Sequence, residues 1–266
     1  MALYDPVNGV YRKVAKKYDP VDGVYRKVTK AYDPVEGVYR QYFSSGTSVG
    51  TLSVGDSVWL NVDGAQKEFL VVHQGNPDSA LYDASCDGTW LLMKDIYKTY
   101  YWATSTSAND YVNSRIHAEL NGTILSKFDA QSAIKQVKIP AATGGGLNCS
   151  VVSGSSGLST KIFLLSFHEV GGTPGSTQYV SADGACLDYF SGTSGLNAKR
   201  IAYYNGTATN WYSRSVTTTN NSSVWFLNNS GEFNSGKHTN YYGIRPAFIL
   251  DSNTPFAQAD GKNIIE

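Results

Sequence analysis

The residue types best able to carry out covalent or metal chemistry are few in this chain and stand far apart. Cys86, Cys149 and Cys186 are an odd number of cysteines at wide, unrelated spacings. A disulfide framework needs paired cysteines, and a zinc site needs ligands at short, regular intervals. We therefore expect buried free thiols, no disulfide framework and no metal ion.

Three short patterns match known catalytic or ligand motifs only in part. Residues 46–50 (Gly-Thr-Ser-Val-Gly) match the nucleophile pattern Gly-x-Ser-x-Gly, but strand-and-turn sequence follows where the nucleophile elbow needs a helix. His168-Glu169 lacks a second histidine, because Gly172 stands at that position. The glycines at 144–146 are not followed by the Lys-Ser/Thr of a phosphate-binding loop. We reject all three motifs and expect residues 141–160 to form a long surface loop.

Residues 210–250 instead combine a rigid apolar set with many small polar residues. Between Val216 and Gly243 only Glu232 and Lys237 carry full charge, so no pair of carboxylates for glycoside hydrolysis is present there. Asn, Ser and Tyr are typical of adaptable binding surfaces, although the same residues also fill loops between strands. The residues that we expect to contact a ligand are Tyr212, Ser213, Ser215, Asn220, Asn221, Ser223, Asn228, Asn229, Asn234, Ser235, Lys237, His238, Asn240 and Tyr241.

Several segments of the chain resemble a phage and bacterial-surface domain family. They are residues 211–215 (Trp-Tyr-Ser-Arg-Ser), 224–231 (Val-Trp-Phe-Leu-Asn-Asn-Ser-Gly) and 242–250 (Tyr-Gly-Ile-Arg-Pro-Ala-Phe-Ile-Leu), together with the order Gly-Asp-Ser-Val, Phe-Leu-Val-Val-His and Gly-Thr-Trp-Leu-Leu-Met between residues 55 and 93. That family is similar to C-type lectins and formylglycine-generating enzymes. It includes the variable proteins of diversity-generating retroelements, in which Asn codons are frequent targets of mutagenesis.

The resemblance implies a non-catalytic phage-tail protein that binds a host-surface protein or glycan through its C-terminal surface. It also implies that Trp225, Arg245 and Pro246 are structural rather than variable. Two alternatives stay open, namely a structural tail component and an enzyme like the formylglycine-generating enzymes. The enzyme is disfavoured because no cysteine follows Cys186. We expect no cofactor.

The chain begins with three copies of Tyr-Asp-Pro-Val-Xaa-Gly-Val-Tyr-Arg, starting at residues 4, 18 and 32. Proline at a turn corner and a flexible glycine, followed by alternating strand sequence, predict a strand, a turn and a strand in each copy. Because short strands bury little alone, we expect residues 1–43 to be an attachment arm that contacts other virion proteins and joins copies of the chain, with a trimer as our hypothesis. Residues 44–50 read as a linker.

Composition limits the remaining partners. The 22 basic and 22 acidic residues balance, which removes the electrostatic argument for nucleic acid as a partner. No run of about 18 apolar residues predicts insertion into a membrane, and the start of the sequence does not resemble a signal peptide. We therefore expect a protein made in the host cytoplasm and located in the virion.

The pattern from residue 51 to 266 predicts one α+β domain with antiparallel strands and two helices. The family resemblance implies that this domain has a C-type-lectin-like fold. Residues 57–73 predict a hairpin that turns at Asp63-Gly64, and residues 88–95 and 161–167 predict buried strands. From Asn109 an apolar stripe recurs at helical spacing, with Asn109 or Asp110 as the cap and Asn121-Gly122 as a break. A second short helix is expected at 130–138, and His117 is expected on a helix surface.

Overall fold

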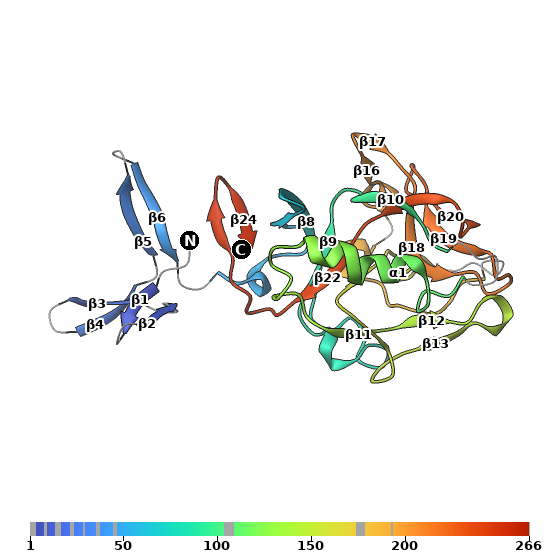
Figure 1. Ribbon diagram of the computed structural model, residues 1–266, viewed down its shortest axis with the longest axis horizontal. Coiled ribbons are helices and arrows are strands. Elements are labelled where there is room, and N and C mark those ends of the chain that lie inside the picture. The colour runs from blue at the N-terminus through green and yellow to red at the C-terminus, as the bar shows by residue number, and fades with distance from the viewer. Residues whose placement is uncertain are drawn as a thin grey trace.

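The computed structural model describes residues 47–103, 109–173, 179–192 and 194–265, and the strand backbone within residues 4–44. The domain consists mostly of β-sheet with few helices, and antiparallel pairs predominate (Figure 1). This confirms the α+β expectation in its general form. No helix among these described residues is long and apolar enough to cross a membrane.

Each of the three N-terminal repeats forms a two-stranded antiparallel hairpin. The hairpins are β1 (Tyr4–Val7) with β2 (Val10–Lys13), β3 (Lys17–Val21) with β4 (Val24–Val28), and β5 (Lys30–Val35) with β6 (Val38–Ser44). The strand pairing of the repeats is as predicted, but the proline lies inside the first strand rather than at the turn corner, because Pro6, Pro20 and Pro34 pair with Tyr11, Tyr25 and Tyr39. The predicted turn glycines, Gly9, Gly23 and Gly37, lie outside the described residues.

A seven-stranded sheet forms the centre of the domain. Its order is β15 (Ile162–Phe163), β22 (Ala247–Leu250), β9 (Thr89–Met93), β8 (Ala65–Gln74), β7 (Ser57–Val62), β24 (Lys262–Ile265) and β23 (Ala257–Ala259). The predicted hairpin at 57–73 is confirmed, with Asp63 and Gly64 in the left-handed region at φ 56° and 72°. Such angles suit the two-residue turn that joins β7 to β8.

Both faces of this sheet are covered by apolar side chains. Along β9, Leu91 and Met93 belong to one hydrophobic cluster, whereas Trp90 and Leu92 belong to a second. Alternation along a strand directs successive side chains to opposite faces, so β9 is buried on both sides. The Gly-Thr-Trp-Leu-Leu-Met sequence is therefore a central strand, as the apolar run predicted.

A second sheet of five strands holds most of the C-terminal stretch. Its order is β10 (Lys98–Tyr101), β21 (Tyr241–Ile244), β18 (Trp211–Val216), β19 (Ser223–Leu227) and β20 (Phe233–Lys237). β18 lies in the middle of the sheet, whereas β10 and β20 are the two edges. Position within the sheet therefore differs strongly along a stretch of similar composition.

The predicted helix after Asn109 is present but begins and continues differently. α1 (Arg115–Glu119) starts after Ser114, whose Oγ accepts the backbone N–H of His117 at 3.1 Å, so Ser114 is the cap. A π-helical turn over residues 120–124 and a 3-10 turn over 125–127 continue α1, and Asn121-Gly122 is not a break. The other helix, α2 (Leu196–Arg200), has no counterpart in the sequence-based expectations.

Two expectations for residues 130–160 are wrong. No helix spans 130–138, because Val137 and Ile139 are buried in β11 (Val137–Ile139), which pairs with β14 (Leu158–Thr160). The expected long loop instead holds a further hairpin, β12 (Ala141–Thr143) with β13 (Ser150–Val152). A last small hairpin joins β16 (Tyr203–Tyr204) to β17 (Thr207–Ala208). Of the expected strand at 161–167, only β15 is regular.

The expected linker is partly integrated into the domain. Val49 is fully buried, its N–H donates to Thr254 O at 2.9 Å, and Ser48 bridges to Pro255. The folded unit therefore starts before residue 51. The three cysteines are free, as expected, but Cys86 alone is fully buried, Cys149 is half-buried and Cys186 is exposed.

Candidate binding surface

Four of the fourteen expected contact residues lie in the interior. Tyr212, Ser213 and Ser215 have no exposed surface, and His238 is 1% exposed. The first three sit on β18, the middle strand of its sheet, where both faces are covered. These four residues cannot contact a ligand in this structure, so that part of the prediction is wrong.

Ser215 and its neighbours belong to a buried polar network around Arg214. The Arg214 guanidinium donates to Glu169 Oε2 at 2.5 Å and Oε1 at 2.6 Å, and to the carbonyl of Asp183 at 2.6 Å. Ser215 Oγ donates to Asp183 Oδ1 at 2.6 Å and accepts the N–H of Phe167 at 2.8 Å. Tyr82 also donates to Glu169, at 2.6 Å.

The charged groups in this network are buried, and each is stabilised by its partners in the network. Burial opposes the charged form of Arg214, but the Glu169 carboxylate outweighs it and raises the pKa of the guanidinium. Burial raises the pKa of Asp183, although Arg214 and Ser215 act in the opposite direction. Arg214, Glu169 and Asp183 have no exposed surface, so the network is a structural element that holds β18 against residues 164–169 and 183.

The other ten expected residues lie at the surface or are half-buried, in four segments of the chain, and Ser223 of one segment pairs with Lys237 of another. Asn220 and Asn221 are in the loop between β18 and β19, Ser223 begins β19, and Asn228 and Asn229 are in the turn before β20. Asn234, Ser235 and Lys237 lie on the edge strand β20, and Asn240 and Tyr241 lie where the chain enters β21.

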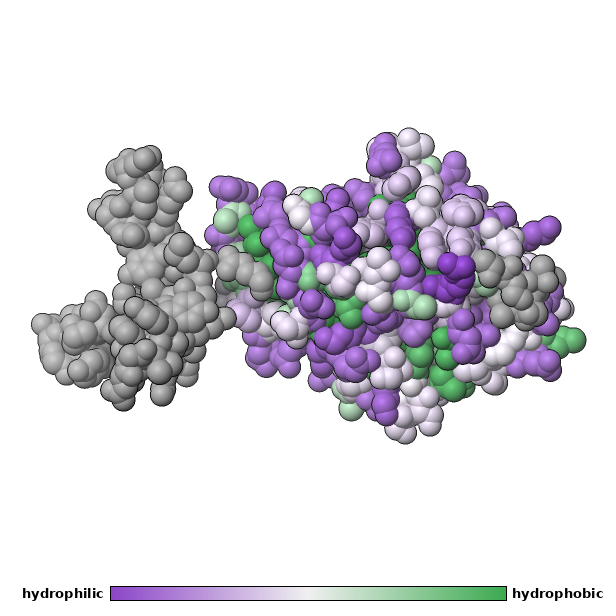
Figure 2. All heavy atoms as spheres, in the orientation of Figure 1, coloured by the Kyte–Doolittle hydropathy of each residue, from purple (hydrophilic) through white to green (hydrophobic). Residues whose placement is uncertain are grey.

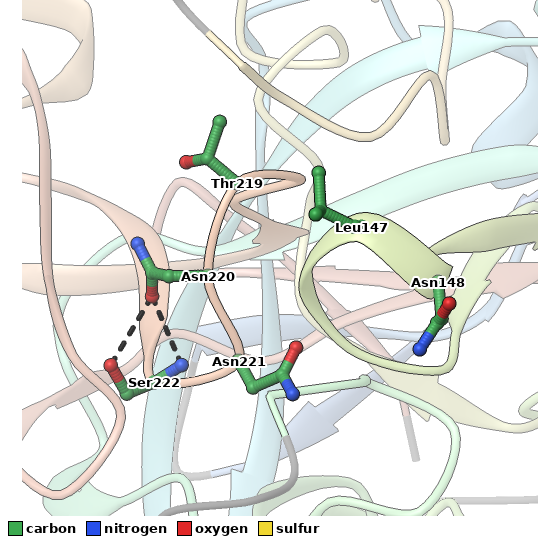
Figure 3. A pocket seen from close by; sticks show the side chains of 6 residues that line it. All are labelled: Leu147, Asn148, Thr219, Asn220, Asn221 and Ser222. Carbon is green, nitrogen blue, oxygen red and sulfur yellow. Dashed lines mark hydrogen bonds between the residues drawn. The ribbon is translucent and has the colours of Figure 1, made fainter.

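One of these places forms a hollow of about 460 Å³ (Figure 3). Its lining comes from the tip of the β12–β13 hairpin and from the loop between β18 and β19, and consists of Leu147, Asn148, Thr219, Asn220, Asn221 and Ser222. None of these side chains is charged. Sequence reasoning found only Asn220 and Asn221 of this set.

Glycines allow the two loops to approach closely beside the hollow. A Cβ on Gly146, at φ 56°, would lie 2.1 Å from Asn221 Oδ1, and a Cβ on Gly145 would lie 2.7 Å from Asn109 Oδ1. The 144–146 glycine run thus has a packing role, since any larger residue would separate the loops. Asn109 fixes the other side by donating to the carbonyls of Asn220 at 2.9 Å and Ser223 at 2.7 Å.

The polar groups of the hollow divide into two kinds. Asn220 Oδ1 accepts the N–H of Ser222 at 3.0 Å and its hydroxyl at 3.2 Å, so this oxygen shapes its own loop (Figure 3). No side-chain hydrogen bond within the described part of the chain involves the Asn148 or Asn221 amide. Leu147 beside them is 87% exposed. The hollow therefore offers amide donors and acceptors next to one apolar side chain and has no group for proton transfer.

Part of the chain matches one known protein family. A family described as Domain of unknown function (DUF6273) matches residues 87–252, more than half of the chain. The chain belongs to this family. The DUF6273 match includes both loops of the hollow and Arg214, Glu169 and Asp183, but not Tyr82 or the N-terminal hairpins. Searches of curated proteins and of solved structures found no match.

The described residues of this DUF6273 protein include no group of three or more His, Cys, Asp or Glu side chains that could hold a metal ion. The thiols are also poorly suited to nucleophilic attack, because burial raises the pKa of Cys86 to about 12 and also raises the pKa of Cys149 and Cys186. Trp225, Arg245 and Pro246 are buried, as the structural role expected for them requires.

Proposed function

We propose that this chain is a non-catalytic receptor-binding or display protein of a phage tail. In this proposal the domain has a C-type-lectin-like fold and binds a host-surface ligand through the loops around the hollow. The observation that carries the proposal is that the entry of the chain and the hollow lie at opposite ends of the domain. The chain enters at residues 47–52 near β24, whereas the loops of the hollow lie at the opposite end of the long axis (Figure 1).

The chemistry of that end supports recognition rather than catalysis. Uncharged amides and hydroxyls form hydrogen bonds in either direction, so exchanging them changes ligand choice without burying a charge. Polar residues also cover most of the visible face of the domain, with apolar residues in small separate areas (Figure 2). Such a surface suits a soluble display module whose contacts are confined to particular loops.

The N-terminal hairpins support an attachment and assembly role. Among the strands that the structure describes, those of each hairpin pair only with each other, which leaves both edges of each two-stranded sheet without a described partner strand. Two-stranded sheets are marginally stable alone, and open edges accept further strands. In our proposal these hairpins join copies of the chain, as a trimer, and bind other virion proteins. Light scattering on the purified chain should then give three times the 28.9 kDa chain mass.

Binding to bacterial cells tests the role of the hollow directly. The fluorescently labelled full chain is incubated with a panel of bacterial strains and bound fluorescence is measured by flow cytometry. We expect a combined Asn148→Ala and Asn221→Ala variant to lose most binding to any strain that the unmodified chain recognises. The matched control is Asn61→Ala, which removes an exposed amide from β7 in the other sheet, outside the hollow and outside the expected contact residues. Equal binding by the unmodified chain and the double variant would contradict the proposal.

The retroelement part of the proposal is tested at the DNA level. A near-copy of the 3′ coding region that differs only at adenines, next to a reverse transcriptase gene, is expected. Without it, the domain is an ordinary adhesin or a structural component. The structural alternative has its own support, since the Asn220 and Asn228 side-chain oxygens accept N–H groups of their own turns.

A further inference from the structure

A group of aromatic side chains, one exposed and two half-buried, lies outside the hollow, where β10 and β21 meet the start of α1. The ring centroids of Tyr100 and Tyr101 are 4.8 Å apart and nearly parallel, and those of Tyr101 and Tyr241 are 5.3 Å apart. Tyr241 is 66% exposed, among the most exposed large hydrophobic or aromatic side chains in the described part of the chain. With Arg115 these three tyrosines form what we name the tyrosine–arginine patch.

Arg115 is held in place by the tyrosines rather than by an acid. Its guanidinium carbon lies 4.6 Å from the centroid of the Tyr101 ring, and its Nη2 donates to the Tyr100 hydroxyl at 3.3 Å. The acid nearby, Glu119, accepts from Lys98 at 2.5 Å. No ion pair among the described residues occupies the Arg115 guanidinium, which has five N–H donors in a planar fork. Most of those donors therefore remain available.

Stacking lowers the cost of binding through this arginine. A free arginine side chain loses rotamer freedom when it pairs with a ligand, whereas Arg115 is already ordered against two rings. Tyrosine adds large contact area at small entropic cost, and Tyr and Arg are enriched among residues that dominate protein interfaces. The patch therefore has the composition and order of an interface anchor.

The net charge at the patch favours a partner with a negative charge. Arg115 and Lys98 carry two positive charges and Glu119 carries one negative charge, which leaves one net positive charge at the patch. The exposed fork of Arg115 matches the two oxygens of a carboxylate. The tyrosine rings beside it match an apolar or aromatic side chain next to that carboxylate.

We propose that the tyrosine–arginine patch is a second binding site, which anchors a protein partner through an Asp or Glu side chain flanked by an apolar residue. This inference goes beyond the proposed function and does not depend on the hollow, because the patch shares no residue with it. Binding at the patch weakens with added salt, since it uses an exposed charge.

A random heptapeptide library tests the inference without knowledge of the natural partner. The library is selected on the full-length chain after depletion on an Arg115→Gln variant, and the enriched peptides are sequenced. We expect Asp or Glu next to an apolar residue in the enriched peptides. Binding of one synthetic peptide is then measured by fluorescence anisotropy. Its affinity should fall about tenfold or more for Arg115→Gln, because the charge-assisted hydrogen bonds to the carboxylate are lost.

Two further variants separate the geometry of the patch from its charge. Arg115→Lys keeps the charge but loses the planar fork, so it should still weaken binding several-fold. Lys67→Gln removes a half-exposed positive charge from β8 in the other sheet and should leave binding unchanged.

Four outcomes would overturn the inference. The first is that the enriched peptides lack acidic residues, and the second is that Lys67→Gln and Arg115→Gln lower the peptide affinity equally. The third is that the peptide binds equally well after its Asp or Glu is replaced by Gln. The fourth is that a uronic-acid polysaccharide binds the patch when no peptide does. In each case cell binding through the hollow could still be intact, so failure of the patch is distinguishable from failure of the proposed function.

Discussion

β18 and the loop that follows it use similar residues but have opposite environments. Within β18, Tyr212, Ser213 and Ser215 are completely buried, whereas Asn220 and Asn221 in the loop are exposed. The strand is the middle one of five, and its polar groups meet internal partners such as Asp183 and Asn240. The loop connects β18 to β19 and lies beside the tip of the β12–β13 hairpin, where its side chains line the open hollow. Small polar residues therefore do not indicate exposure unless the position of the segment in the sheet is known.

The largest test of this contrast is Arg214→Ala. The substitution leaves the Glu169 carboxylate buried without its partner, which costs about 3–5 kcal/mol in the free energy of unfolding. Urea denaturation followed by tryptophan fluorescence measures this loss. Arg115→Ala is the control, because Arg115 is exposed and should leave the unfolding midpoint nearly unchanged. A stable Arg214→Ala protein would mean that the network does not hold β18 in place.

A smaller loss is expected from Ser215→Ala on the same strand. The variant removes the donor to Asp183 Oδ1 and the acceptor of the Phe167 N–H, and unpaired buried groups of this kind cost about 1–3 kcal/mol. Ser235→Ala, on the exposed edge strand β20, should change stability by about 0.5 kcal/mol or less. Similar losses for both serines, measured by the same denaturation, would remove the distinction between central and edge strand.

The sequence predicted the parts of the fold that local patterns determine. The turn at Asp63-Gly64 and the apolar run of β9 are predictable because each depends on residues that are adjacent in the sequence. The helix expected at 130–138 is wrong, because the distant partner β14 pairs with Val137–Ile139 and makes that end of the segment a strand. Longer-range pairing is not visible in local periodicity.

The site was predictable in composition but not in assembly. Asn220 and Asn221 were found because amide-rich loops are a local signal, whereas Leu147 and Asn148 come from a hairpin about seventy residues away along the sequence. An isolated leucine inside a Gly/Ser-rich segment could have drawn attention to the hairpin tip. The Arg214–Glu169 pair was missed because 45 residues separate its members.

Acid should affect the interior histidine that was expected at the surface. Burial lowers the pKa of His238, so its neutral form is favoured in the folded state. Its contribution to stability is present above the unfolded pKa of about 6.5 and is lost as pH falls through the lower folded pKa. His238→Gln should therefore reduce the fall in Tm between pH 7 and pH 5. The fall in Tm of a His117→Gln variant is measured over the same pH range for comparison, because burial also lowers the pKa of His117. An unchanged pH dependence in the His238 variant would show that this ring is hydrated.

The smallest expected effect distinguishes two neighbouring residues within the loop. Asn220 caps its own turn by accepting the N–H of Ser222 at 3.0 Å, so Asn220→Ala should cost about 0.5–1.5 kcal/mol of stability. The Asn221 side chain has no hydrogen bond within the described residues, and Asn221→Ala should stay within about 0.5 kcal/mol of the unmodified chain. Thermal unfolding and cell binding of both variants, measured together, should then separate, with Asn220→Ala reducing Tm and Asn221→Ala reducing binding alone. If Asn221→Ala reduces Tm as much as Asn220→Ala does and leaves binding intact, both asparagines are loop-forming residues and the structural alternative is favoured.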